Sequence, residues 1–197
     1  MHLKDKAIDT AEILDGRTNS FFQFLEGIAR MPIFHDTDAS YADKVAAIQR
    51  EVAFNKSLHD AALITKDGFL IDKDNRKMPV SDTKWFKTAI QGNRAVTEPF
   101  TSITDGELVI TFAIPVYDDN NEIINVLAAV TLASLLSDQI DDIVIGKTGE
   151  CYILGEEGSI IAHKKFDLVK RYGLYMRKIR LFKNSILCRS YSRLFIY

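Results

Sequence analysis

A long amphipathic segment near the N-terminal end constrains the fold of this chain more than any other feature. Apolar residues recur between Ile8 and Ile28 at spacings of mostly three, four or seven, the pattern of a helix with one buried face. The pattern predicts a helix over Leu3–Arg30, which ends because the residue before Pro32 avoids helical backbone angles. Its apolar stripe must be covered, either by a sheet of the same chain or by the helix of a second copy.

A second helix and a β-hairpin follow this segment. Ser40 and Asp43 stand in the positions of a capping box, which predicts a helix that starts at Ser40 and continues through Val52. The runs AALIT and FLID then flank the turn Asp67-Gly68, a dipeptide that supplies the positive φ of a tight hairpin turn. Two helices therefore precede the first strand.

The next predicted helix carries Trp85, the only tryptophan of the chain. It follows the polar loop DKDNRKMPVSD, and we expect Asp82 to cap its first turn and Gly92 to end it. Composition alone leaves Trp85 two roles, a core residue or the wall of a pocket, because large aromatic residues are mostly buried for packing. Its place on a first helical turn after a polar loop favours the pocket.

Three strand-like runs come next, each bounded by turn residues. They are AVTEPFTSI, ELVITFAIPVY and EIINVLAAVTL, at residues 95–103, 107–117 and 122–132. Together they predict an antiparallel meander with one face packed on helices. The run LASLLSDQIDDIVI then returns to a helical pattern. The expected fold class is α+β, with a long N-terminal helix and a PAS-like antiparallel sheet.

A second, related unit opens after Ile145. The strand CYIL, the turn GEEG and the strand SIIAH repeat in miniature the hairpin of residues 63–71. The unit is not completed, so we expect an incomplete second PAS-like lobe. The predicted organisation is an N-terminal helical region at 1–60, a sheet lobe at 61–143 and a partial lobe with an atypical basic tail at 144–197.

The last part of the chain differs in charge from the rest. From Lys164 onward there are ten Lys and Arg residues and one acid, Asp167, although the whole chain has a net charge of −2. Clustered basic and aromatic residues suit a nucleic acid or a membrane surface, but no recognition motif accompanies them. The segment also lacks clean strand alternation. We therefore favour an unstructured or incidental tail and expect no nucleic-acid partner.

Little in the sequence points to catalysis, a metal or a cofactor. There is no GxSxG, Walker, GxGxxG or HExxH motif, and the four histidines are scattered. Cys151 and Cys188 stand apart from any Cys or His cluster, so we expect buried or idle thiols. We expect no enzyme activity, no catalytic residue, no metal ligand and no cofactor. No stretch approaches the roughly 18 apolar residues of a membrane span.

Three motifs, in this order, resemble the double Cache (dCache) sensor domains of bacterial transmembrane receptors. They are SDTKWFKTAIQG, EPFTSITDGELVITFAIPVYDDNNEIINVLAAVTLASL and IGKTGECYILGEEGSIIAHKKFDLV. The likeness runs from about Leu14 to Val169 and is greatest to methyl-accepting chemotaxis proteins. It implies a periplasmic or extracellular part of a cell-membrane receptor, in which the membrane-distal lobe at 61–143 binds a small ligand. No reaction follows, and binding shifts helix positions.

The resemblance also bears on the partners and leaves the output module open. It implies a homodimer in the full receptor, which meets the membrane only through segments absent from this chain. A histidine kinase or a diguanylate cyclase can use the same sensor. A cytosolic PAS-type cofactor-binding or enzyme domain is the alternative of another class.

The ligand-contacting positions of the family transfer residue by residue. Trp85 matches the pocket tryptophan of the family, with Lys84 beside it. The other matches replace family residues: Thr83 an arginine that binds a carboxylate, Phe100 a tyrosine, Ser102 an acid, and Thr131 or Val130 a later aspartate. The expected ligand-binding residues are therefore Thr83, Lys84, Trp85, Phe100, Ser102 and Thr131.

These replacements make the expected pocket neutral and rich in hydroxyl groups. An unpaired ion in a pocket is costly, so a carboxylate favours a guanidinium partner and an ammonium favours a carboxylate. We therefore expect a small neutral or weakly anionic solute. An amino acid or a carboxylate is the alternative, with Lys84, Arg76 or Lys77 as the source of the missing cation.

After Lys170 the chain departs from the family pattern. A truncated or frame-shifted end and a divergent native lobe both account for the departure. If the lobe is incomplete, its hairpin leaves exposed sheet edges that need another partner.

Overall fold

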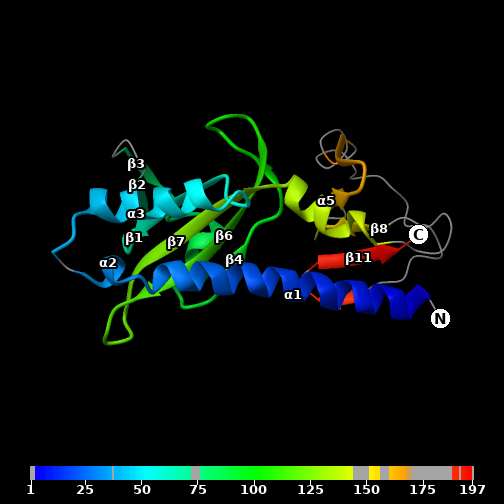
Figure 1. The fold of residues 1–197 in the computed structure, drawn as a ribbon, viewed down its shortest axis with the longest axis horizontal. Coiled ribbons are helices and arrows are strands. Elements are labelled where there is room, and N and C mark those ends of the chain that lie inside the picture. Colours follow the sequence, from blue (N-terminus) through cyan, green and yellow to red (C-terminus); the bar gives the residue numbers. More distant parts are fainter. Residues whose placement is uncertain are drawn as a thin grey trace. The chain divides into compact units, whose positions relative to one another are not determined.

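The structure, a computed structural model, divides the chain into two compact units (Figure 1). It describes residues 3–36, 38–71, 76–143, 151–155, 160–167, 169, 188–190 and 192–196. The sheet unit comprises Asn19–Phe100 and Val109–Leu132. The terminal unit comprises Met1–Thr18, Thr101–Leu108 and Ala133–Tyr197. Each unit is an α+β arrangement of antiparallel strands and helices, which confirms the expected fold class.

The N-terminal helices form as their sequence patterns predict. Helix α1 spans Leu3–Ala29, and Pro32 opens the short helix α2 (Pro32–His35), where its missing N–H costs no intrahelical bond. Helix α3 spans Tyr41–Phe54. Ser40 caps it: its Oγ accepts from the backbone N–H of Asp43 at 3.2 Å and donates to the Asp43 carboxylate at 2.7 Å. The predicted capping site at Ser40 is confirmed.

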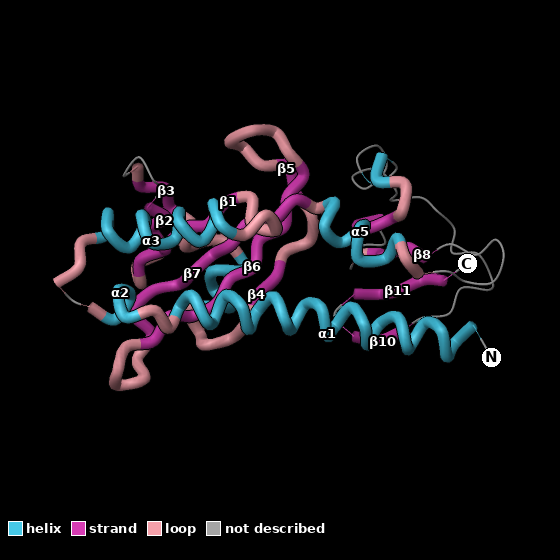
Figure 2. The backbone as a smooth tube through the Cα atoms, in the orientation of Figure 1, coloured by secondary structure: helices cyan, strands magenta, loops and turns pink. Residues whose placement is uncertain are grey.

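The sheet unit is built on one antiparallel sheet in the order β3-β2-β1-β7-β6-β4, with β5 paired to β6 (Figure 2). Its strands are β1 (Asp60–Thr65), β2 (Phe69–Ile71), β3 (Lys77–Pro79), β4 (Ala95–Val96), β5 (Phe100–Thr101), β6 (Leu108–Tyr117) and β7 (Ile123–Leu132). The hairpin β1–β2 confirms the turn prediction, since Gly68 has φ 81°. A Cβ at Gly68 would lie 2.6 Å from Cβ of Ser81, so only glycine fits.

The predicted strand over residues 95–103 is wrong as a single element, because the chain forms two short strands, β4 and β5, instead. Thr97 N–H still donates to Thr111 O at 3.0 Å, but Thr111 N–H donates to the side-chain Oγ1 of Thr97, also at 3.0 Å. Pro99, which follows, has no N–H to donate to a ladder. The hydroxyl and the proline together interrupt the pairing.

The two faces of the sheet have different covers. On one face, Phe112 of β6 contacts Phe21 and Phe22 of α1, with ring centroids 4.6 Å and 5.3 Å away. On the same face, Asn125 of β7 accepts a hydrogen bond from Tyr41 of α3. We call this the helix face. The residues next to helix-face residues along each strand point to the opposite face, since side chains alternate along a strand.

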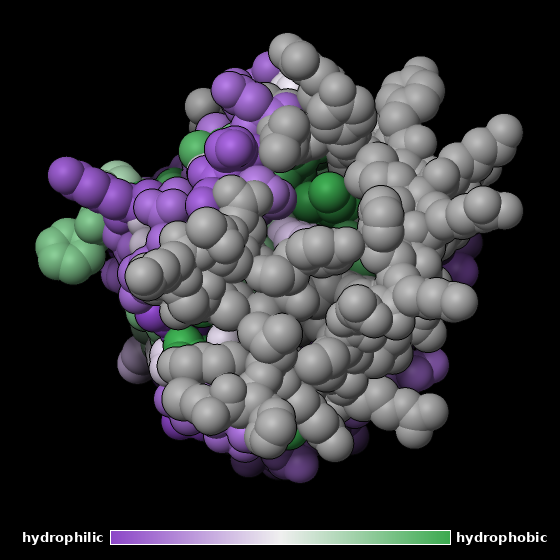
Figure 3. Space-filling model, turned by 90° about the vertical axis from the view of Figure 1, so that its right-hand side faces the viewer, coloured by the Kyte–Doolittle hydropathy of each residue, from purple (hydrophilic) through white to green (hydrophobic). Residues whose placement is uncertain are grey.

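The terminal unit contains helix α5 and a small antiparallel sheet. Helix α5 spans Ser134–Asp141. The strands are β8 (Cys151–Leu154), β9 (Ile160–His163), β10 (Cys188–Ser190) and β11 (Ser192–Ile196), in the order β10-β11-β8-β9. The pairing of β8 with β9 confirms the second hairpin. Its predicted turn lies largely outside the described residues. Among the described residues visible in Figure 3, hydrophilic ones predominate, with small hydrophobic areas between them.

The expectation of an unstructured tail is wrong for residues 188–190 and 192–196, which form β10 and β11. Strand β11 pairs antiparallel with β8, so that Leu194 lies opposite Ile153 and Phe195 opposite Tyr152. The open edge of β8 supplies the partner, and pairing of this kind depends on the neighbouring strand more than on local propensity. Strand β8 is therefore an inner strand, and the exposed edge expected there is covered.

Intramolecular packing covers most of the apolar stripe of α1. In the sheet unit Phe22, Leu25 and Ile28 are buried. In the terminal unit Ala11 and Leu14 pack against a buried cluster formed by Ile140, Cys151, Ile153, Ile161 and Ala162. Of the two alternatives that the sequence left open, packing within the chain covers these parts of the stripe. Ile8 and Ile13 remain partly exposed. None of the described helices has the length and apolarity to cross a membrane.

Cys151 is a free thiol within this buried cluster. Burial raises its pKa to about 11, so at neutral pH the sulfur is protonated and unreactive. This matches the expectation of an idle thiol at this position. The side chain of Cys188 lies outside the described residues.

Candidate ligand-binding site

Helix α4 (Lys84–Ala89) starts one residue later than predicted, because Thr83 and not Asp82 is its cap. Thr83 Oγ1 accepts from the backbone N–H of Phe86 at 3.4 Å and donates to the carbonyl of Val80 at 2.7 Å. Asp82 instead faces Lys87, whose Nζ lies 3.5 Å from its carboxylate. Both hydroxyl functions of Thr83 are thus used to fix the start of α4.

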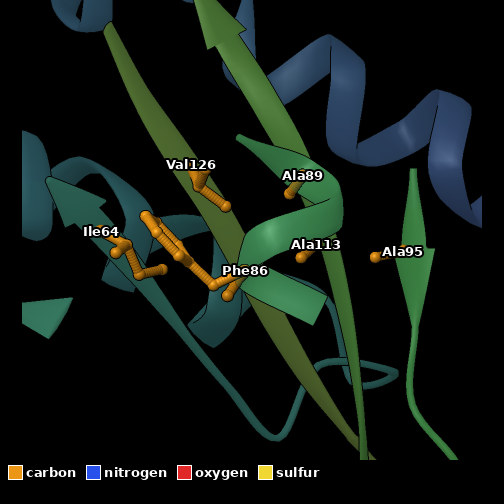
Figure 4. Close-up of a cluster of buried hydrophobic side chains, with 7 residues drawn as sticks. Ile64, Phe86, Ala89, Ala95, Ala113 and Val126 are labelled. Carbon is orange, nitrogen blue, oxygen red and sulfur yellow. The ribbon is translucent and has the colours of Figure 1, made fainter. Parts of the chain in front are cut away.

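Phe86, the neighbour of Trp85, fills the core beneath α4. It is 5% exposed and belongs to a buried cluster (Figure 4) made of Ile64, Phe86, Ala89, Ala95, Ala113, Val126 and Ala128. Trp85 is half-buried and packs against the edge of this cluster. Its ring is perpendicular to that of Phe86, with centroids 6.3 Å apart. The core role goes to Phe86, which leaves Trp85 at the rim.

We call the side of the sheet that carries this cluster the α4 face. Three of the five cluster residues that the sheet contributes are alanines, so the sheet there presents little side-chain volume. Four partly buried apolar residues also pack against the cluster: Leu70, Val80, Trp85 and Ile90. A small solute bound on this face would contact apolar surface with an indole at its edge.

Thr131 lies on the other side of the sheet. It is fully buried opposite Ile110, two residues along from the Phe112–Ala129 pair that faces the helices. Its Oγ1 has no hydrogen-bond partner among the described residues. The neighbouring Val130, half-buried, points to the α4 face by the same alternation. Thr131 and Trp85 therefore lie on opposite faces of the sheet, whereas Val130 lies on the same face as Trp85.

The other predicted site residues are Lys84, Phe100 and Ser102. Lys84 is exposed on the first turn of α4, beside Thr83. Phe100 lies in β5 and is 41% exposed. Ser102 belongs to the terminal unit, where its N–H donates to Glu107 O at 2.8 Å and its Oγ accepts from Thr104 N at 3.2 Å. Thr83, Lys84 and Trp85 are consecutive residues at the start of α4, with Thr83 as its cap.

Thr111 is a candidate that the sequence analysis missed. It is 4% exposed, pairs with Val130 and lies between two helix-face residues of β6, so its side chain points to the α4 face. The signal was available in the strand alternation. It required knowing which face α4 covers, and that is a property of the folded chain.

Comparison with known proteins identifies the family. A family model for the Cache domain (dCache_1) matches residues 2–192. The chain belongs to the Cache domain family. Cache domains are sensor and ligand-binding domains, a non-catalytic type. No curated protein matches this chain.

Solved Cache domains of chemoreceptors have the same fold. The ligand-binding domain of Campylobacter jejuni Tlp3, in complex with 4-methylisoleucine, matches with TM-score 0.65 and 13% identity over 92% of this chain and 73% of that chain. The domain of the Pseudomonas aeruginosa amino acid chemoreceptor PctC, with GABA, gives 0.63 and 16% over 97% and 93%. Pseudomonas fluorescens CtaA, with L-valine, gives 0.70 and 15% over 98% and 93%. At these identities the likeness shows the fold of this Cache domain.

Proposed function

We propose that this chain is the extracytoplasmic sensor domain of a chemotaxis receptor and that the α4 face binds its stimulus, a small neutral or weakly anionic solute. In this proposal residues 61–143 form the membrane-distal ligand-binding lobe and residues 144–197 part of the membrane-proximal lobe. The full receptor is a homodimer that transmits binding through segments outside this chain. Membership of the Cache family supports the sensor role.

The position of Trp85 carries the proposal. It is half-buried at the rim of the α4 face, while Phe86 supplies the core contact. An indole held at the edge of an apolar surface offers a flat wall and one N–H donor to a bound solute. Thr111 and Val130 lie across the same face, so the surface combines apolar area with a hydroxyl group.

The chemistry of Thr83 supports a neutral ligand. Related domains have been solved with isoleucine, L-valine and GABA, each of which carries both a carboxylate and an ammonium group. In this chain Thr83 donates its proton to Val80 O and accepts from Phe86 N–H, and it brings no charge. A buried carboxylate without a charged partner is costly, so a zwitterion is disfavoured here. Arg76, Lys77 and Lys84 are exposed.

A thermal-shift screen tests the proposal. The panel contains neutral polyols and amides, weak organic acids, α-amino acids and GABA. A neutral or weakly anionic solute should raise Tm with increasing concentration, by about 5 °C or more at roughly 100 times its Kd. Isothermal titration calorimetry then measures the affinity.

Two variants locate the binding. Trp85→Leu should abolish the shift, measured against its own melting curve. Phe54→Leu changes an aromatic residue of α3 that is 89% exposed, and it should retain the shift. A response to amino acids and GABA alone would contradict the ligand class. Equal loss in both variants would contradict the site, and no response to any solute would contradict the sensor role.

A further inference from the structure

Arg94 connects the loop after α4 to helix α1 within the sheet unit. Its Nε donates to Glu26 Oε1 at 2.7 Å and its Nη1 donates to Asn19 Oδ1 at 3.2 Å. Its Cζ lies 5.3 Å from the ring centroid of Phe22. A single guanidinium therefore contacts three residues of α1, spread over about two helical turns.

The loop that carries Arg94 is anchored beneath α4 at both ends. Ala89 ends the helix and Ala95 opens β4, and both belong to the buried cluster of the α4 face. Between them Gly92, with φ 90°, donates to the carbonyl of Ala89 at 2.9 Å, and Asn93 donates to that of Thr88 at 3.3 Å. The segment is short and its turn is fixed, so a displacement of α4 displaces Arg94.

We propose that Arg94 couples the α4 face to residues 19–29 of α1, so that a change at Trp85 alters the conformation of that helix through the guanidinium. The identity of the natural stimulus rests on the proposed function, but the coupling itself does not. Helix α1 continues without interruption from Ala29 back to Leu3, which gives the coupled segment a direct covalent extension.

The exposure of the pair argues for a coupling role over a role in stability. The Arg94 and Glu26 side chains are 38% and 30% exposed, and ion pairs of this kind contribute little to folding. The geometry is nevertheless specific, because the planar fork engages a carboxylate and an amide while its face meets a ring. Removing the Arg94 guanidinium should leave the fold intact and reduce the response of α1 to a change at the α4 face.

A second route between the same elements runs through the sheet. Phe112 contacts Phe21 and Phe22 on the helix face, and the next residue, Ala113, belongs to the α4 face. Spatial continuity alone does not decide between two routes, whereas a double-mutant cycle measures the energy that each carries.

The test uses hydrogen exchange measured by mass spectrometry on the full chain, followed in peptides that cover residues 19–29. Trp85→Leu is the perturbation, applied in four backgrounds: the unchanged chain, Arg94→Gln, Glu26→Gln and Lys87→Gln. Lys87→Gln is the matched control, because it removes an exposed ion pair of α4 that joins it to Asp82. For each background, the exchange rate with Trp85→Leu is divided by the rate without it, which removes the effect of the background substitution itself.

In the unchanged and Lys87→Gln backgrounds, Trp85→Leu should speed exchange in this segment by about fivefold or more, the lower end of typical coupling between sites. In Arg94→Gln and Glu26→Gln the factor should fall below about twofold. An undiminished factor in Arg94→Gln would assign the coupling to the sheet, and no effect in the unchanged chain would show that none exists. If circular dichroism shows that Trp85→Leu is unfolded, Trp85→Phe replaces it.

This test needs no solute, so its failure is distinguishable from failure of the proposed function. Loss of the coupling leaves the thermal-shift response to a solute unaffected. Conversely, a chain whose Tm no solute raises can still show the Arg94-dependent effect on hydrogen exchange in α1.

Discussion

The sheet unit and the terminal unit each attach α1 with one arginine, but in opposite directions. In the terminal unit Arg17 belongs to α1 and reaches the C-terminal end of α5, where it donates to the carbonyl of Gln139 and lies 3.5 Å from Asp142. In the sheet unit Arg94 comes from the α4 loop and reaches side chains of α1. A helix end is a fixed feature of the fold, whereas the α4 loop borders the candidate site.

The difference suggests two roles for the same residue type. Cations at a helix C-terminus satisfy orphan carbonyls and oppose the helix dipole, so Arg17 is expected to stabilise. Arg94 makes a partly exposed ion pair beside the proposed ligand face, so it is expected to report on that face.

The largest effect is expected for Phe86→Ala. Removal of this buried ring from the α4 face should cost about 3 to 5 kcal/mol of unfolding free energy, the usual range for Phe→Ala in a core. Trp85→Ala should cost less than half of that, because the indole is half-buried. Urea denaturation measures both. Equal losses would place Trp85 in the core and remove the reason to treat it as a pocket wall.

The next effect is expected for Thr83, which caps α4. Thr83→Ala should cost about 1 kcal/mol, whereas Thr83→Ser, which keeps the hydroxyl, should be close to neutral. Thr83→Arg should lose the cap as Ala does, even if it improves the binding of carboxylates. Thermal denaturation with and without glycine, L-valine or GABA separates the two consequences. A Thr83→Ala variant with unchanged stability would contradict the capping role.

Arg17→Gln tests the terminal half of the comparison. The side chain is 37% exposed, so the loss should be about 0.5 to 1 kcal/mol, typical of a cation at a helix end. Hydrogen exchange should rise in α5, with residues 19–29 of α1 unaffected. Arg94→Gln should show the reverse pattern. If both variants affected the same peptides, the division of roles between the two arginines would be wrong.

The smallest effect is expected at Asp118, in the turn between β6 and β7. The backbone N–H of Glu122 lowers the pKa of this carboxyl below 3.8, and Asn120 and His35 add to the effect. A carboxyl group with a lowered pKa in the folded state stabilises the fold at pH values above its unfolded-state pKa. That stabilisation is lost as the pH falls through its folded-state pKa. Asp118→Asn should therefore reduce the decrease of Tm between about pH 5 and pH 3. The same dependence of Tm on pH in Asp118→Asn as in the unchanged chain would contradict this role of the Asp118 carboxylate.

Much of the fold was predictable because its elements carry strong local signals. The period of α1, the Ser40 cap, the Gly68 turn and the two long strands β6 and β7 were all found within one or two residues. The misses had other causes. Asp82 and Thr83 are both good caps, and in the folded chain Thr83 accepts from Phe86 N–H while Asp82 faces Lys87. Strands β10 and β11 depend on the edge that β8 offers.

The candidate site was less predictable for a similar reason. Periodicity places Val130 and Thr131 on opposite faces, but it does not say which face α4 covers. The register of β7 against β6 and the aromatic contacts of Phe112 settle this. The resemblance at the level of motifs pointed to β7 and left the choice between its adjacent residues Val130 and Thr131 open.

The fluorescence of Trp85 tests the central claim most directly, because it is the only tryptophan and lies at the rim of the α4 face. A solute chosen by the thermal-shift screen is titrated into the full chain while the emission is recorded. We predict a saturable change in the intensity or wavelength of this emission, with the same midpoint as calorimetry. A solute that raises Tm and binds in calorimetry without changing this emission would show that the stimulus binds elsewhere.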